Sequence, residues 1–114
     1  MPTSLLDLER SDTGNADLAV VGVNGKLSLE TVHGFASTMR EEPAKVLIFD
    51  MSKCSFLDSA GVGALVSLFV SRRNHGKKLL LAALTQQGNA VMQVSGLIKL
   101  LPLYASVEEA KAAQ

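Results

Sequence analysis

The dipeptide Asp58-Ser59 carries the most distinctive chemistry in the sequence. It stands between a short apolar segment and an apolar helical pattern over 60–74, so we expect it at the start of a helix that follows a strand and a short loop. Asp and Ser are favoured there because their oxygens accept hydrogen bonds from unpaired backbone N–H groups of the first turn. Two interpretations follow: an ordinary helix cap, or a functional site on a helix N-terminus that faces solvent.

Two glycines, Gly61 and Gly63, fall in the first turns of the same predicted helix. Each costs roughly 0.8–1 kcal/mol relative to alanine in a helix interior, so a compensating role is expected. Either the helix start packs very close to the sheet, or the backbone of a partner approaches it. A nucleotide-binding phosphate loop would need a longer glycine-rich segment closed by Lys-Ser or Lys-Thr, which the sequence lacks.

Catalysis by Ser59 would require a base beside its hydroxyl. A serine hydrolase uses a histidine and usually a Gly-x-Ser-x-Gly turn, whereas this serine follows an aspartate. His33 and His75 lie far apart, without a Cys or His at ligand spacing, and we interpret both as surface histidines. Cys54 is the only cysteine, which excludes an internal disulfide and fits a reducing compartment. We therefore predict a protein that is not an enzyme and has neither a metal site nor a cofactor.

Helical periodicity predicts which face of the 60–74 helix could receive a partner. One line of residues forms an apolar stripe headed by the serine, and a neighbouring line points to the core. The stripe is either a docking surface or a patch covered by a neighbouring loop. The stripe comprises Ser59, Gly63, Val66 and Val70, and the core line comprises Val62, Leu65 and Phe69.

Length and composition indicate one globular domain over 1–114. Hydrophobic residues make up 47% of the chain and charged residues 19%, which is typical of a compact fold. The 11 basic residues balance 11 acidic ones, so nucleic acid is not expected as a partner. Two basic pairs, Arg72-Arg73 and Lys77-Lys78, flank the turn at 74–76, and we interpret them as a solvated helix end.

No segment is predicted to enter a membrane or to direct export. The longest nearly apolar run, 60–70, has 11 residues, against about 20 for a helix that spans a bilayer. The first residues lack a basic segment followed by a long apolar core. We therefore expect a soluble cytoplasmic protein.

Strand and helix patterns alternate along the chain, after an antiparallel pair of strands over 4–10 and 18–23 that is joined by the turn at 12–15. Alternation implies right-handed parallel crossovers, so we predict an α/β fold with a mixed, mostly parallel sheet of four to five strands and about four helices. Gly25 is expected to end the second strand. The elements expected next are a helix over 28–40 capped by Ser28, a strand over 45–50, the 60–74 helix ended by Gly76, a strand over 77–83, a helix over 87–94, an edge strand over 99–103 and a helix that starts at Ser106.

Three segments of this chain, 46–50, 56–63 and 94–97, resemble the STAS domain of bacterial anti-sigma factor antagonists. The resemblance covers nearly the whole chain and includes 25–27 and 108–110. Its most specific part is the Asp-Ser-x-Gly-x-Gly motif within 56–63. The resemblance implies a single STAS domain.

In that family, the serine that follows the aspartate is phosphorylated by a partner anti-sigma factor that is itself a kinase, and a phosphatase restores the serine. The unphosphorylated antagonist binds the anti-sigma factor and frees the sigma factor. The resemblance therefore implies phosphorylation at Ser59. The residues expected at the partner surface are Ser28, Asp58, Ser59, Ala60, Gly61, Gly63, Val66 and Val70.

Three classes of function follow. The favoured one is a protein-binding module switched by phosphate, because a helix N-terminus tolerates a phosphate, whereas a phosphate beside Asp58 in an apolar interface would expel the partner. The second is an unphosphorylated STAS scaffold in a transport or signalling assembly. Ser28, which stands where many members carry an aspartate, and the lack of a second serine directly after Ser59 keep this alternative open. The third, an enzyme with a nucleophilic serine, is disfavoured for want of a base.

Overall fold

The chain begins with an antiparallel ribbon of β1 (Leu6–Ser11) and β2 (Leu18–Leu27). The structure is a computed structural model and describes residues 5–114. The predicted N-terminal strand pair is confirmed for these residues, and residue 4 lies outside them. The prediction that Gly25 ends the second strand is wrong, because β2 continues through this glycine at a φ of +121° to Leu27.

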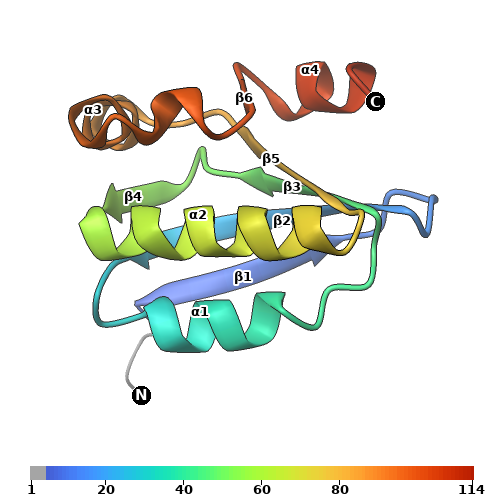
Figure 1. The fold of residues 1–114 in the computed structure, drawn as a ribbon, viewed down its shortest axis with the longest axis horizontal. Helices are drawn as coiled ribbons and strands as arrows, with labels where there is room; N and C mark the ends of the chain where they lie inside the picture. The colour runs from blue at the N-terminus through green and yellow to red at the C-terminus, as the bar shows by residue number, and fades with distance from the viewer. Residues whose placement is uncertain (1–4) are drawn as a thin grey trace.

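A mixed sheet forms the centre of the fold, in the order β1-β2-β3-β5-β6 (Figure 1). β3 (Val46–Asp50), β5 (Lys78–Ala82) and β6 (Leu103–Tyr104) run parallel to β2. Among the described strands, only the β1-β2 pair is antiparallel. The predicted fold class, a mixed and mostly parallel α/β sheet with an N-terminal antiparallel pair, is confirmed.

A short strand, β4 (Cys54–Leu57), occupies the segment that the sequence analysis treated as a loop before Asp58. It pairs in parallel with the extended end of β2, Gly25–Leu27, beyond the point where β3 stops pairing with β2. Its four residues are too few for a clear alternation pattern, and its partner positions exist only because β2 runs past Gly25. Over the described residues, the sheet therefore has six strands where four to five were expected.

In the part of the chain that the structure describes, four α-helices pack on this sheet: α1 (Val32–Met39), α2 (Ser59–Asn74), α3 (Gln86–Ser95) and α4 (Val107–Ala112). α1 and α2 lie side by side along one face (Figure 1). α4 packs on the opposite face through Ala110. The helix count agrees with the prediction, and Gly76, at a φ of +72°, follows the end of α2 as expected.

Two predicted boundaries are wrong. The helix expected from Ser28 starts only at Val32, because the chain first makes a turn in which the Ser28 carbonyl accepts the Thr31 and Val32 N–H groups at 2.9 and 3.0 Å. The strand expected over 99–103 is instead a 3-10 helix, Leu97–Lys99, followed by β6.

Alternate residues of the central strands build two cores, one on each face of the sheet. Leu47 and Phe49 of β3 lie under α1 and α2, where Phe49 packs against Phe35 of α1 with ring centroids 5.3 Å apart. Ile48, between them in sequence, packs with Ala110 on the α4 face. The larger core thus holds α2 firmly and fixes the position of its N-terminus.

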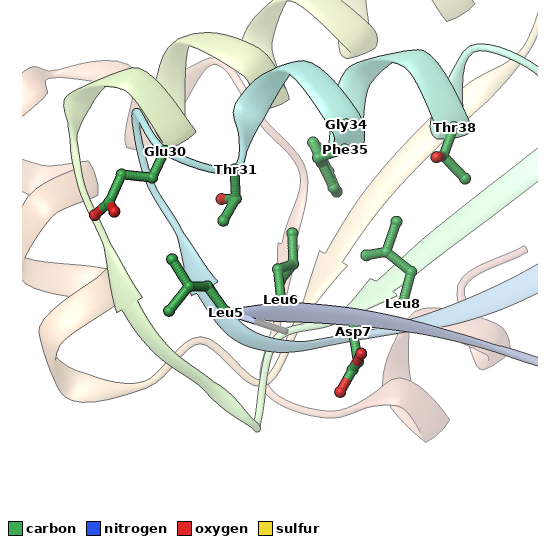
Figure 2. A pocket seen from close by; sticks show the side chains of 9 residues that line it. All are labelled: Leu5, Leu6, Asp7, Leu8, Glu30, Thr31, Gly34, Phe35 and Thr38. Carbon is green, nitrogen blue, oxygen red and sulfur yellow. The ribbon is translucent and has the colours of Figure 1, made fainter. Parts of the chain in front are cut away.

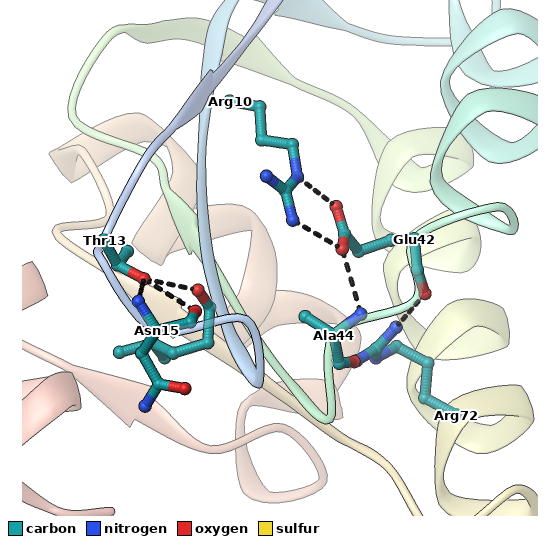
Figure 3. A network of polar contacts seen from close by, with 7 residues as sticks. Arg10, Thr13, Asn15, Glu42, Ala44 and Arg72 are labelled. Atoms are coloured by element: carbon teal, nitrogen blue, oxygen red, sulfur yellow. Dashed lines mark hydrogen bonds and ion pairs between the residues drawn. The ribbon is translucent and has the colours of Figure 1, made fainter.

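The far end of α2 is fastened by Arg72, which the sequence analysis placed at a solvated helix end. That prediction is wrong, since Arg72 is only 6% exposed. Its guanidinium donates to the carbonyls of Glu42 and Ala44 (Figure 3). Its Nε donates to the Lys78 carbonyl at 2.9 Å. The Glu42 carboxylate in turn accepts two hydrogen bonds from Arg10, at 2.7 and 3.1 Å. β1, the α1–β3 connection, α2 and β5 are therefore joined at one end of the sheet.

Candidate functional site

Ser59 is the first residue of α2 and is exposed to solvent. Asp58 is the N-cap of this helix, with extended backbone, and its Oδ1 accepts the Gly61 N–H at 2.8 Å. The Ser59 hydroxyl makes no hydrogen bond to any other part of residues 5–114. The predicted helix cap and the predicted exposed serine are thus both present, because the aspartate caps the helix and leaves the serine free.

The second carboxylate oxygen of Asp58 fastens another segment to the site. Oδ2 accepts the Leu29 N–H at 3.1 Å, and the Asp58 N–H donates to the Leu27 carbonyl at 3.3 Å. The turn after β2 is therefore held against the start of α2. Both carboxylate oxygens are engaged with backbone, so Asp58 is a structural anchor beside Ser59 and not a base for it.

Close packing on the sheet explains one of the two glycines at the start of α2, Gly61. A Cβ built at this position would overlap the Leu27 carbonyl oxygen and lie 2.8 Å from Leu57 Cδ1. Close packing of the helix start on β2 therefore requires this glycine. Gly63 is different, because it is exposed and a Cβ there would meet nothing within 4 Å.

The α2 stripe, defined as Ser59, Gly63, Val66 and Val70, lies only partly in the open. Gly63 is exposed and Val70 is 37% exposed, whereas Val66 is half-buried against the core. The stripe is therefore a shallow apolar strip behind the serine. Ala60, the remaining predicted contact on the helix, is half-buried.

The predicted core line of α2 is confirmed at Val62 and Leu65, which are buried. The third residue of this line, Phe69, is only half-buried. Leu68, which the sequence analysis did not assign to the core, is also buried. Its position three residues after Leu65 is the helical signal that could have identified it.

The turn after β2, which Asp58 holds against the start of α2, contains two further residues that bear on the site. Ser28 is 4% exposed, and its hydroxyl is buried without a hydrogen-bond partner in the described part of the chain. Its side chain therefore presents no surface in this structure, and its expected role as helix cap is not observed. Leu29, which no sequence pattern singled out, is 71% exposed beside the Asp58 carboxylate.

Other reactive groups lie elsewhere. His33 and His75 are exposed as predicted, and His75 Nδ1 lies 2.7 Å from the Ser71 carbonyl oxygen. Cys54 is buried, and this burial raises the pKa of its thiol above the ordinary value.

Within residues 5–114, no three His, Cys, Asp or Glu side chains are grouped as a metal site. Over the same residues, no helix has the length and apolar character to cross a bilayer.

Two hollows flank α1. One, of about 560 Å³, lies between β1 and α1, where Leu6 and Leu8 point toward the helix and Asp7 points away (Figure 2). It does not include the serine. The other, of about 430 Å³, lies between α1 and α2 and reaches Ala60, next to Ser59. The groove between the two helices therefore reaches the residue after the serine, although the serine itself does not line it.

The fold and this helix start define the chain as a small α/β domain of the STAS type. The family model described as "STAS domain" matches residues 10–110, and the chain belongs to this family. The family predicted from the motif is thereby confirmed.

Curated relatives include an anti-sigma-B factor antagonist of Listeria monocytogenes, which is 24% identical over 98 residues and 86% of each chain. Among solved structures, an anti-sigma factor antagonist from Mycobacterium paratuberculosis gives a TM-score of 0.81 at 21% identity, over 95% of this chain and 92% of that one. The Bacillus protein SpoIIAA in its phosphorylated form gives 0.70 at 20% identity, over 94% and 98%. These structural likenesses establish the fold. Proteins so named are binding proteins and not enzymes, which agrees with the class expected from the sequence.

Proposed function

We propose that this protein is an anti-sigma factor antagonist that is switched by phosphorylation of Ser59. In its unphosphorylated form it binds an anti-sigma factor that is a serine kinase and so releases a sigma factor. A phosphatase returns the phosphorylated form to the binding state. The observation that carries the proposal is the exposed hydroxyl of Ser59 at the N-terminus of α2, which has no hydrogen-bond partner among residues 5–114.

The helix start is suited to accept a phosphate without unfolding. Asp58 uses one oxygen for the Gly61 N–H, and the Asp58 carbonyl accepts the Val62 N–H at 3.0 Å. The N–H groups of Ser59 and Ala60 have no acceptor within residues 5–114. Free N–H groups and the positive end of the helix dipole favour an anion at this place.

The same phosphate would oppose partner binding. The proposed contact surface consists of an apolar strip, the α2 stripe, with Leu29 and Ala60 beside Ser59. A phosphoserine adds about −1.5 to −2 charges next to Asp58. A partner that covers the strip would have to desolvate these charges, so the phosphorylated form should dissociate. Asp58 and Gly61 support this surface by fixing the backbone beneath it.

A pull-down from the native cell, followed by a kinase assay, tests the proposal. Wild-type protein, Ser59→Ala and the control Ser55→Ala, which alters an exposed serine of β4, are used as baits. A recovered kinase should, with ATP, phosphorylate wild type and the control on Ser59 and leave Ser59→Ala unmodified, as shown by tandem mass spectrometry.

Other outcomes separate the alternatives. Phosphate on Ser55, with none on Ser59, would overturn the site assignment. Recovery of a transport or signalling assembly, without phosphorylation of Ser59, would support the scaffold alternative. Hydrolysis of an ester substrate that disappears in Ser59→Ala would instead place the protein among enzymes.

A further inference from the structure

Within residues 5–114, the first half of β5 pairs with a strand on one side only, which is β3. β6 pairs with β5 only at Leu81 and Ala82, where the Leu81 N–H donates to the Pro102 carbonyl at 2.9 Å. Successive backbone groups of a strand alternate in direction, so the Leu79 N–H points to the same side as that of Leu81, where β6 is no longer beside it. A hollow of about 400 Å³ lies along this edge, and we name it the β5-edge pocket.

The walls of the β5-edge pocket are largely apolar and partly aromatic. Phe69 comes from α2 on one face of the sheet, and Tyr104 packs with the core on the other face. Pro102 and Ala113 complete the apolar lining. Its volume lies in the range of about 300–1,000 Å³ that small-molecule sites occupy.

Three cationic side chains line the same pocket: Arg73, Lys77 and Lys78. The Arg73 guanidinium lies 5.8 Å from the centre of the Phe69 ring, and none of the three forms an ion pair within residues 5–114. No acidic side chain from these residues lines the pocket. Because the chain carries equal numbers of basic and acidic residues, this grouping is a local excess of positive charge.

We propose that the β5-edge pocket binds a small organic anion with an aromatic body and a carboxylate head. The aromatic body would lie against Phe69, Tyr104 and Pro102, and the carboxylate would be bound by the three cations, with the Leu79 N–H as a further donor. The pocket is separate from the serine, because Phe69 is ten residues along α2 from Ser59, about 15 Å at the rise of a helix. The proposal therefore stands independently of the phosphorylation switch.

Titration of the isotope-labelled protein with naphthoate, followed by two-dimensional NMR, tests this site. The amide signals of Lys78, Leu79 and Tyr104 should shift, and those of Ser59 and Ala60 should not. Naphthamide, which is neutral and of the same shape, should bind at least about tenfold more weakly, as should inorganic phosphate, which lacks the aromatic body.

Variants that remove positive charge test whether the cations of the β5-edge pocket bind naphthoate. Arg73→Gln/Lys77→Gln should weaken naphthoate binding at least about tenfold. The matched control Arg40→Gln/Lys53→Gln, which removes two exposed cations outside the pocket, should leave it unchanged. The amide spectrum verifies that each variant is folded, and Lys77→Gln alone replaces the double variant if that one is not. Equal affinity for naphthoate and naphthamide, shifts confined to another surface, or no loss in the pocket variants would each overturn the proposal.

Discussion

Gly61 and Gly63 lie two residues apart on one helix, but the structure gives them different roles. Gly61 is packed against the Leu27 carbonyl and the Leu57 side chain, whereas Gly63 faces open space. Close approach to the sheet therefore accounts for the first glycine and not for the second. Under the proposed function, Gly63 is the position at which the backbone of a partner would approach α2.

Replacing each glycine with alanine tests this distinction. Gly61→Ala should lower the free energy of unfolding by about 1–3 kcal/mol, because the new methyl group forces α2 away from β2. Gly63→Ala should raise it by up to about 1 kcal/mol, the ordinary helix preference for alanine. Urea denaturation of both variants checks the prediction, and it is contradicted if the two changes have the same sign.

Asp58 is expected to contribute more than an ordinary cap, because its second oxygen holds the Leu29 N–H. Asp58→Ala should lower the free energy of unfolding by about 1–2 kcal/mol. Thr85→Ala is the matched control, since Thr85 caps α3 through a single bond to the Gly88 N–H. Asp58→Ser, which can still cap the helix, should recover part of the loss. Denaturation measures the loss in free energy of unfolding for each variant. A smaller loss in Asp58→Ala than in Thr85→Ala would show that the bond to the Leu29 N–H does not add to the helix cap.

At the scale of elements, the Arg10-Glu42-Arg72 network joins three segments that are distant in sequence. Arg10 holds the pKa of the Glu42 carboxyl below its ordinary value of 4.5, chiefly through their hydrogen bonds. The pKa of a carboxyl group is lowered when folding stabilises its charged form. This stabilisation is therefore complete above about pH 4.5 and is lost as the pH falls through the lower, folded-state pKa.

Glu42→Gln should lower the free energy of unfolding at pH 7 by about 1–3 kcal/mol, because it weakens the hydrogen bonds between the buried Glu42 carboxyl and the half-exposed Arg10. The difference in the free energy of unfolding between wild type and variant should become smaller below about pH 4.5. Glu41→Gln, at the exposed neighbouring position, serves as the control and should show no such difference. Denaturation curves at several pH values check this prediction. A difference in the free energy of unfolding between wild type and Glu42→Gln that stays constant as the pH falls below 4.5 would contradict it.

The sequence predicted the long, strongly patterned α2 with its aspartate cap. It also predicted the short last helix, whose N-cap Ser106 and acidic first turn are visible in the sequence. It did not predict β4, because a four-residue strand depends on the neighbouring end of β2 and not on its own pattern. Nor could spacing reveal that Ser28 is buried, or that Arg72 turns inward to three carbonyl groups from other segments. These features are set by tertiary contacts.

In the whole molecule, the two ends of α2 are held differently. At one end of α2, the network around Arg72 fixes the helix to the rest of the fold. At the other end, Ser59 is exposed, and its hydroxyl makes no hydrogen bond within the described part of the chain. A chemical change at the serine can therefore alter the surface without altering the domain, which is what a switch between two binding states needs.

Ser59→Asp is expected to separate stability from binding. A carboxylate in the first turn of α2 interacts favourably with the helix dipole by about 0.3–1 kcal/mol, so the variant should be at least as stable as wild type. Its affinity for the anti-sigma factor should nevertheless fall, because an unpaired charge would be buried against an apolar strip at a cost of several kcal/mol.

Ser59→Ala should bind about as well as wild type, because it adds no charge, and Ser52→Asp, which places the same charge in the exposed turn after β3, should bind normally. Thermal melting measures the stability of each variant, and titration calorimetry with the recovered anti-sigma factor measures affinity. Equal affinities of Ser59→Asp and Ser59→Ala would show that charge at this helix start does not control the partner. A lowered melting temperature in Ser59→Asp would show that the domain itself, and not only its surface, responds to the serine.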